Sequence, residues 1–319
     1  GQYYPALTAT DGSSGAQAAV LPLLKKNAAF RTNVGFQNLT GASCSGEVKL
    51  YGATGSQVGS TRTLTAAADK FIQEDDIFVK AGAGTQDVAY ARVQVTTAGC
   101  KAWFFGSVVD AVTNDPTTVP QVLSVAGPYW VPSIAHLKGA GTSQWRSNIA
   151  VVNRSGATAN LTLVYTPYSA GATVTREHAL ANNAAVEWSD VLVTLFNFAN
   201  TATPKGTVKI TSDRPVFAMA RTYNQADSGT FGQYYPALVA GNAITSGQTA
   251  VLPLLKKSAS FRSNVAFQNL GGASCTGTVK LYDAAGTQVG TTRTLTAAVD
   301  KYIQEDDTFV KAGAGNREP

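Results

Sequence analysis

The chain has 319 residues, of which 14% are charged and 44% hydrophobic, and its formal net charge is +5 at pH 7. This hydrophobic fraction argues against disorder, and the scattered Lys and Arg residues argue against a dedicated nucleic-acid surface. No apolar run approaches the roughly 18 residues of a membrane span, and no basic-then-apolar leader stands at the N-terminus, so we expect mature or excised material.

The sequence repeats itself. Residues 1–84 align with residues 232–315 without a gap, and about three-quarters of the positions are identical. A more distant copy lies between them, because FRTNVGFQN (30–38) and FRSNVAFQN (261–269) bracket WRSNIAVVN (145–153). The predicted units are of about 115 residues, in an A-B-A′ order: unit A (1–115), unit B (116–231) and an incomplete second copy of unit A (232–319).

The apolar period within each unit is two, which is typical of strands. Val34 and Phe36 alternate with polar or small residues, and so do Val48 and Leu50. Turn sequences such as NLTGAS and VTNDP interrupt these runs every 8–12 residues or so. The pattern predicts an all-β fold of tandem antiparallel β-sandwich, immunoglobulin-like units. The third unit lacks about two strands of its own, so we expect it to expose apolar surface and sheet edges.

A short helical turn is predicted after QEDD (73–76). An Asp of this segment can accept the free N–H groups of the first turn, and Gly82 can close the far end. Glu74, Asp75 and Asp76 together also suggest calcium, which prefers several oxygen ligands. Helix capping is the preferred interpretation, because no Asp-x-Asp-x-Asp-Gly spacing occurs and the acids are not all repeated in unit B.

Cysteines occur in unit A and are absent from unit B. Cys44 and Cys275 occupy the same repeat position, and unit B lacks a Cys at the positions of both Cys44 and Cys100. Because the two are present or absent together, we predict a Cys44–Cys100 disulfide, with Cys275 left unpaired; three free thiols are the alternative. A disulfide favours an oxidising, extracellular location.

No catalytic or cofactor site emerges from the pattern. The two histidines, His136 and His178, both lie in unit B, and His178 aligns with Arg62 of unit A. No nucleophile, base and orienting group can be assembled consistently with the repeats, and His and Cys do not cluster at zinc-ligand spacing. We therefore expect no enzyme, no cofactor and no metal other than the calcium alternative.

The opening segment is a candidate for contacts between subunits. Its copy at 232–238 follows a strand of unit B after a turn, and it can be the last strand of B, the first of A′ or a linker. Such a segment could be donated as a strand to the incomplete unit of a neighbouring subunit. The candidate residues are Gln2, Tyr3, Tyr4, Pro5, Ala6 and Leu7. One donated strand does not obviously replace two missing ones.

The chain resembles bacterial secreted proteins built from tandem immunoglobulin-like β-sandwich units, including surface adhesins and subunits of extracellular filaments. The repeated FRTNVGFQN, SVVDAVTNDPTTVP and TFGQYYPAL carry this resemblance. It implies a stalk, fibre or adhesive role and transfers no functional residues.

Two functions follow as hypotheses. The first is a non-enzymatic extracellular structural protein, a rod or self-assembling filament subunit that contacts identical subunits or continues a longer array. The alternative is an adhesin or carbohydrate-binding module of a larger secreted or surface protein. Exposed aromatic residues on one face of each unit would support the alternative, with Tyr3, Tyr4, Tyr129 and Trp130 as first candidates.

Overall fold

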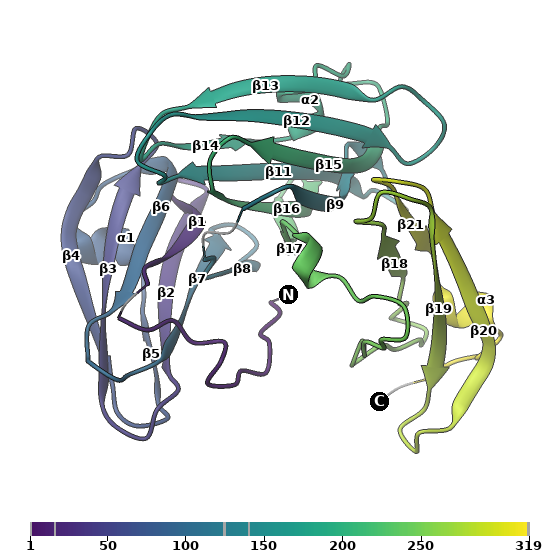
Figure 1. The fold of residues 1–319 in the computed structure, drawn as a ribbon, viewed down its shortest axis with the longest axis horizontal. Helices are drawn as coiled ribbons and strands as arrows, with labels where there is room; N and C mark the ends of the chain where they lie inside the picture. Colours follow the sequence, from purple (N-terminus) through teal and green to yellow (C-terminus); the bar gives the residue numbers. More distant parts are fainter. Residues whose placement is uncertain (1, 16, 124–125, 140, 318–319) are drawn as a thin grey trace.

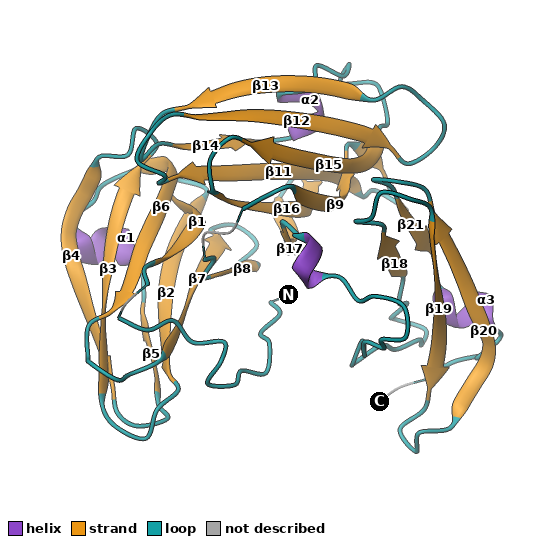
Figure 2. Ribbon diagram, viewed as in Figure 1, coloured by secondary structure: helices purple, strands orange, loops and turns teal. Residues whose placement is uncertain are grey.

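The computed structural model describes residues 2–15, 17–123, 126–139 and 141–317. Gly1 and Pro319, the outer limits of the predicted first and third units, lie outside them. Within the described ranges the protein is all-β, with only short helices (Figure 2). The name "repeat" is used below for residues 1–115, 116–231 and 232–319, and these limits stay predictions.

The elements are as follows. The first repeat and the join after it carry β1 (Ala19–Lys26), β2 (Phe30–Asn38), β3 (Cys44–Gly52), β4 (Gln57–Ala66), β5 (Phe71–Glu74), α1 (Ile77–Ala81), β6 (Gln86–Val95), β7 (Ala102–Asp110) and β8 (Pro116–Pro120). The second carries β9 (Tyr129–Ala135), β10 (Leu137–Lys138), β11 (Gln144–Asn153), β12 (Ala159–Pro167), β13 (Val174–Leu180), β14 (Ala185–Trp188), α2 (Val191–Thr194), β15 (Lys205–Ser212), β16 (Val216–Ala226) and β17 (Gly229–Pro236). The third carries η1 (Ala240–Asn242), β18 (Val265–Gln268), β19 (Cys275–Tyr282), β20 (Gln288–Ala297), β21 (Tyr302–Glu305) and α3 (Thr308–Ala312).

The prediction of tandem immunoglobulin-like sandwiches is wrong. The small antiparallel sheets are arranged like the blades of a four-bladed β-propeller (Figure 1). Four sheets have four or five strands: β1-β6-β3-β4, β5-β2-β7-β8, β13-β12-β15-β9, and β10-β11-β16-β17 with β14 on β11. The third repeat adds the two-stranded sheets β18-β21 and β19-β20. The resemblance to tandem immunoglobulin-like proteins is corrected with the fold.

The physical reason for this error is that the local pattern of a strand does not encode its neighbours. A period of two with frequent turns describes a short strand with one buried face, and propeller blades and sandwich sheets share that description. The strand prediction itself is confirmed. Along β3, buried and partly exposed residues alternate without interruption, with Val48 and Leu50 fully buried.

Apolar residues from neighbouring sheets form the core. The largest cluster joins the two sheets of the first repeat through side chains such as Leu21, Phe36, Leu50 and Phe104. It continues into the second repeat through Met219. A smaller cluster, which includes Val20, Tyr90 and Phe217, also joins these two repeats. The first and second repeats therefore share buried surface.

Polar contacts fix the joins between repeats. At the first join, the Asp110 carboxylate accepts hydrogen bonds from the N–H and the hydroxyl of Thr230, both at 2.8 Å, and Lys25 Nζ lies 2.8 Å from Glu187 Oε1. At the second join, Asp300 receives a hydrogen bond from Trp130 Nε1 at 2.8 Å and contacts Lys209 Nζ at 3.1 Å. Figure 1 shows the resulting arch, with the second repeat between the other two.

The internal copy of the opening segment, residues 232–238, contributes to strand β17 at the second join. β17 pairs with β16 in antiparallel register, with Tyr235 opposite Ala220 and Gln233 opposite Thr222. At the same place in the first repeat, β8 pairs with β7. The GQYYP sequence of 232–236 is therefore the last strand of a sheet whose other strands belong to the second repeat.

The short helices begin differently from the prediction. α1 ends as expected, because Gly82 has φ of 64° and its N–H donates to the carbonyl of Val79. At the other end, Asp76 makes no capping hydrogen bond with its side chain. Its backbone instead adopts a left-handed conformation, and its N–H donates to Asn33 Oδ1 at 3.0 Å. The same arrangement recurs at Asp190 and Asp307.

A buried asparagine that ends β2 and β11 and directly follows β18 is a shared feature that the sequence pattern did not reveal. In the second repeat, Asn153 Nδ2 donates to the carbonyls of Ala157, Leu180 and Ala181 at 2.7, 2.8 and 3.2 Å. Asn38 and Asn269 make the corresponding three bonds in the other repeats. One amide group thus ties the strand end to two loops.

We expect Asn153→Ala to lower the free energy of unfolding by about 2–3 kcal/mol. The substitution removes all three hydrogen bonds of the amide, including the buried one to the carbonyl of Leu180, and leaves the space of a fully buried side chain unfilled. Asn160→Ala is the matched control, because Asn160 is exposed and a surface change should stay within about 0.5 kcal/mol. Urea denaturation followed by circular dichroism measures both; equal effects would contradict the role of the buried amide.

Candidate functional site

The three predicted acidic residues are all engaged with neighbouring side chains. Glu74 receives a bidentate ion pair from Arg62, Asp75 accepts a hydrogen bond from Gln73 at 2.8 Å, and Asp76 pairs with Lys26 at 2.5 Å. Among the described residues, no group of three or more His, Cys, Asp or Glu side chains is placed to hold a metal ion. Glu74, Asp75 and Asp76 therefore do not form a set of calcium ligands in this structure.

The Arg62–Glu74 pair shows how the repeats differ. Glu74 raises the pKa of the Arg62 guanidinium through a hydrogen bond and its charge, and the third repeat has the same pair as Arg293–Glu305. In the second repeat Trp188 stands in place of Glu74, since it faces Ile149 as Glu74 faces Val34.

Strand register also corrects the assignment of His178. Arg176, not His178, is the equivalent of Arg62, and it donates to the carbonyls of Leu195 and Phe196 at 3.1 and 3.0 Å. His178 packs against the ring of Trp188 at a centroid distance of 5.1 Å, and burial lowers its pKa.

The other histidine is held in the interior. His136 Nδ1 lies 2.8 Å from Asp190 Oδ2, and its Nε2 lies 3.0 Å from the carbonyl oxygen of Asn200. The residue is only 2% exposed, and both ring nitrogens are used. His136 thus connects β9, α2 and the loop after it, which is a structural role.

The four aromatic candidates for ligand binding separate into two kinds. Tyr129 and Trp130 are buried; the hydroxyl of Tyr129 donates to the carbonyl of Val216, and Trp130 serves the join with Asp300. Tyr3 is 72% exposed and Tyr4 46% exposed. The buried pair cannot present flat ring faces to a carbohydrate.

The candidate inter-subunit segment 2–7 lies against its own repeat. Gln2 Nε2 donates to Ser107 Oγ at 2.9 Å, and the rings of Tyr4 and Phe105 pack in a T-shaped arrangement with their centroids 5.0 Å apart. Both partners belong to β7. The segment forms no strand, whereas its copy in 232–236 does. Its use between subunits stays a prediction.

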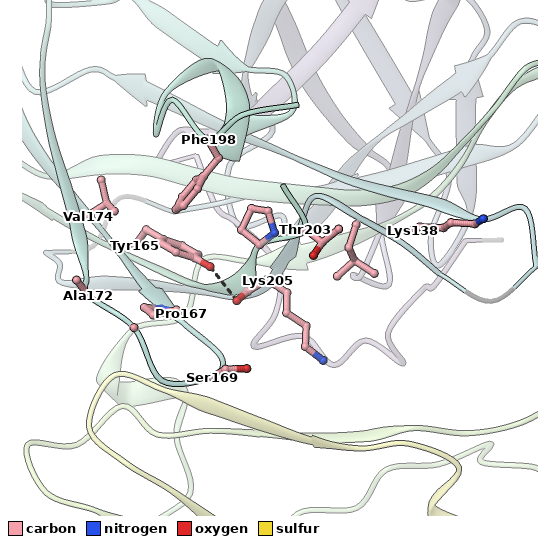
Figure 3. Close-up of a pocket in the computed structure, with 12 residues that line it drawn as sticks. Lys138, Tyr165, Pro167, Ser169, Ala172, Val174, Phe198, Thr203 and Lys205 are labelled. Atoms are coloured by element: carbon pink, nitrogen blue, oxygen red, sulfur yellow. Dashed lines mark hydrogen bonds between the residues drawn. The ribbon is translucent and has the colours of Figure 1, made fainter. Parts of the chain in front are cut away.

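A pocket of about 600 Å³ opens at one end of the second repeat (Figure 3). Tyr165 and Phe198 form one wall with ring centroids 5.2 Å apart, and the Tyr165 hydroxyl donates to the carbonyl of Lys205 at 2.9 Å. Burial raises the pKa of Tyr165 to about 12, so it stays a neutral donor. The ammonium of Lys205 lies 4.1 Å from the ring centroid of Tyr168. These contacts give Tyr165, Phe198 and Lys205 structural roles.

The disulfide prediction is confirmed, and it marks a difference between the first and third repeats. Cys44 and Cys100 form a disulfide, with their Cα atoms 5.9 Å apart. Cys275, the repeat equivalent of Cys44, is a free and exposed thiol. No helix among the described residues is long and apolar enough to cross a membrane.

The third repeat leaves open a face that the first repeat covers. In the first repeat, β1 has the sequence AVLPLLKK, pairs with β6 and is buried. The identical sequence at 250–257 forms no strand, and Leu252 and Leu254 are 57% and 84% exposed, whereas Leu21 and Leu23 are 0% and 3% exposed. The same residues therefore lie in two opposite environments.

Beside this segment lies a groove of about 820 Å³. Its walls include Val265, Phe267, Val279 and Leu281, the equivalents of Val34, Phe36, Val48 and Leu50 in the core of the first repeat. Val265 and Leu281 are each only 4% exposed, so the exposed apolar surface here belongs to Val251, Leu252 and Leu254 beside the groove. A contiguous exposed apolar surface is one mark of an interaction site. We take the groove together with residues 250–255 as the candidate functional site and name it the open face.

Comparison with protein-family models and with curated proteins finds no match to this chain. The exposure of the third repeat could be anticipated from its missing strands. The site at 250–255 could not, because these residues are the same as in β1.

Proposed function

We propose that this protein is a non-enzymatic extracellular structural protein, a repeat-built rod or self-assembling filament subunit. The observation that carries the proposal is the join between the first and second repeats, where apolar side chains of both form shared core clusters, because a contact of this kind can continue from one copy to the next. Head-to-tail contact through one face of one end generates open filaments when it does not close into a ring. The Cys44–Cys100 disulfide supports an oxidising environment, and extracellular location is part of the proposal.

The alternative, a carbohydrate-binding or adhesive module, has less support. Two of its four aromatic candidates, Tyr129 and Trp130, are buried. The open face is lined largely by apolar side chains, and of its three aromatic residues, Phe267, Tyr282 and Phe309, only Tyr282 is largely exposed, at 57%, which offers a sugar ring a single stacking surface.

Negative-stain electron microscopy of the purified chain tests the proposal. We expect ordered filaments with an axial repeat near the length of one subunit. Leu254→Asp should abolish them, because it places a charge in the middle of the open face. Val310→Asp is the matched control, since Val310 is 59% exposed and its equivalent Val79 is 62% exposed even in the covered first repeat. Monodisperse single subunits from the unchanged chain, or filaments that persist in Leu254→Asp, would sink the proposal.

A further inference from the structure

A lysine, a glutamate and an asparagine meet at the join between the first and second repeats. Lys25 Nζ lies 2.8 Å from Glu187 Oε1, and Asn148 Nδ2 donates to the same oxygen at 2.6 Å. Lys25 belongs to β1 of the first repeat, whereas Asn148 and Glu187 lie on β11 and β14 of the second. One carboxylate oxygen therefore holds an amine of one repeat beside an amide of the other.

The three side chains are shielded from water. The side chain of Glu187 is 1% exposed and that of Lys25 13% exposed, and Asn148 is 5% exposed. The ring of Phe30 lies beside the ammonium group, with its centroid 5.3 Å from Lys25 Nζ. An ion pair in such surroundings has lost much of its hydration, and transfer of one proton from the ammonium to the carboxylate removes both charges. The lysine then carries a neutral amine, which is a nucleophile.

The side-chain amide of Asn148 is held in the way that an electrophile requires. Its Oδ1 accepts a hydrogen bond from the backbone N–H of Asp190 at 3.0 Å. A fixed backbone donor of this kind stabilises the negative charge that develops on a carbonyl oxygen when a nucleophile adds to its carbon. The nitrogen of the same amide contacts Glu187, which can protonate it as it leaves.

We propose that Lys25 and Asn148 form an isopeptide bond, with Glu187 as the catalytic acid and base. The bond links the first repeat to the second through their side chains. Both residues belong to one chain, so this modification site is independent of contacts between chains. It goes beyond the proposed structural role, because it makes the join between the repeats covalent.

The reaction balances without any further reagent. Glu187 takes a proton from the ammonium group of Lys25, and the electron pair of the neutral Nζ forms a bond with Asn148 Cγ. Glu187 passes that proton to Nδ2, and the Cγ–Nδ2 bond breaks, with its electron pair going to the leaving nitrogen. Nζ releases a second proton to Glu187, which transfers it to the departing ammonia, so ammonium leaves. One amide is exchanged for another, and nothing is oxidised or reduced.

The other repeats lack parts of this set. Strand register places Gln73 and Gln304 at the position of Glu187, and a glutamine amide does not take the proton of an ammonium group. Ala135 stands at the position of Lys25 in the second repeat, since the backbone N–H of each donates to an equivalent hydroxyl. Within the described part of the chain, the repeat positions therefore bring the complete set together only at the first join.

Intact-mass spectrometry of the purified full chain, denatured and reduced, is the test. We expect a mass lower than that of the sequence by one ammonia. Proteolysis should give one pair of peptides joined through Lys25 and Asn148, which separates the bond from ammonia loss at another amide. The full mass of the sequence, with no joined peptides after prolonged incubation of the folded chain, would overturn the proposal.

Three variants test the roles of the side chains. Lys25→Arg should abolish the joined peptides. Glu187→Gln introduces the residue that the other repeats have here, and it should slow formation of the bond about a hundredfold or more, because it removes the group that moves the protons. Lys256→Arg is the matched control, since Lys256 has the same repeat position as Lys25 but makes no contact with Glu187; it should keep the bond. An unchanged rate in Glu187→Gln, with its fold checked by circular dichroism, would overturn the catalytic role.

This proposal and the assembly role can fail separately. A linked chain that forms no filaments supports the isopeptide bond and removes self-assembly. Filaments built from chains of full, unlinked mass support assembly and overturn the bond.

Discussion

Alanine at position 21 is expected to lower the free energy of unfolding of the first repeat by about 3–5 kcal/mol, whereas alanine at the equivalent position 252 should cost the third repeat less than about 0.5 kcal/mol. Leu21 is fully buried in the largest apolar cluster, and its removal leaves a cavity between two sheets. Leu252 is 57% exposed, so its truncation removes little packing. The same substitution at equivalent positions of the same sequence should therefore lower the free energy of unfolding by several kcal/mol in the first repeat and hardly at all in the third.

Hydrogen exchange resolved along the chain is the appropriate measurement, because three linked repeats need not unfold in one transition. Amides of β3 and β6 report on the first repeat, and those of β19 and β20 on the third. A large loss for Leu252→Ala would show that residues 250–255 are packed in solution, and the open face would lose its basis.

Removal of the disulfide by Cys44→Ser with Cys100→Ser should lower the stability of the first repeat by about 4 kcal/mol. The two cysteines are 56 positions apart, and closing a loop of that length reduces the entropy of the unfolded chain by about this amount. Two buried serine hydroxyls add a desolvation cost of their own, so the effect of reductant on the unchanged chain isolates the contribution of the cross-link.

The matched control is Cys275→Ser, which alters an exposed residue without a cross-link and should leave stability unchanged. Urea denaturation with and without reductant checks both variants. The double variant should no longer respond to reductant, whereas the Cys275→Ser chain should respond as the unchanged chain does. A reductant effect that persists without Cys44 and Cys100 would assign the stabilisation elsewhere.

Local patterns in the sequence predicted local structure well. Alternation along 44–52 identified the buried residues of β3, and the shared presence of Cys44 and Cys100 identified the disulfide. The conformation of Gly82 followed from its position after a short apolar turn. In each case the evidence lay within one strand or in one pair of positions.

Long-range arrangement was not encoded in the same way. The period of two is shared by blades and sandwich sheets, so the propeller-like arrangement was missed. The false equivalence of His178 and Arg62 has a related cause: a shift of two residues along a strand keeps every side chain on its own face. Pairing across the sheet, with Val48 opposite Arg62 and Leu163 opposite Arg176, was needed to choose the register.

The Asp capping prediction failed for a different reason. The composition of QEDD allows an Asp to accept N–H groups from the first turn, but Lys26 and Asn33, far away in sequence, compete for Asp76. The carboxylate pairs with Lys26, and the asparagine turns the backbone into the left-handed region. Tertiary contacts of Asp76 thus replaced the local side-chain cap that the sequence predicted.

The exchange of Glu74 for Trp188 between neighbouring repeats has a consequence for how the chain reaches its fold. Tandem copies of similar sequence are prone to misassembly by exchanging hairpins with the adjacent copy while the chain is being made. A hairpin of the first repeat that intruded into the second would bring Arg62 to a tryptophan and lose its carboxylate. Nearly identical copies are separated along this chain by a divergent one. Because of this alternation, the hairpin that is nearest in the chain cannot form the Arg62–Glu74 ion pair when it takes the place of the correct one. Correct pairing is therefore favoured during synthesis.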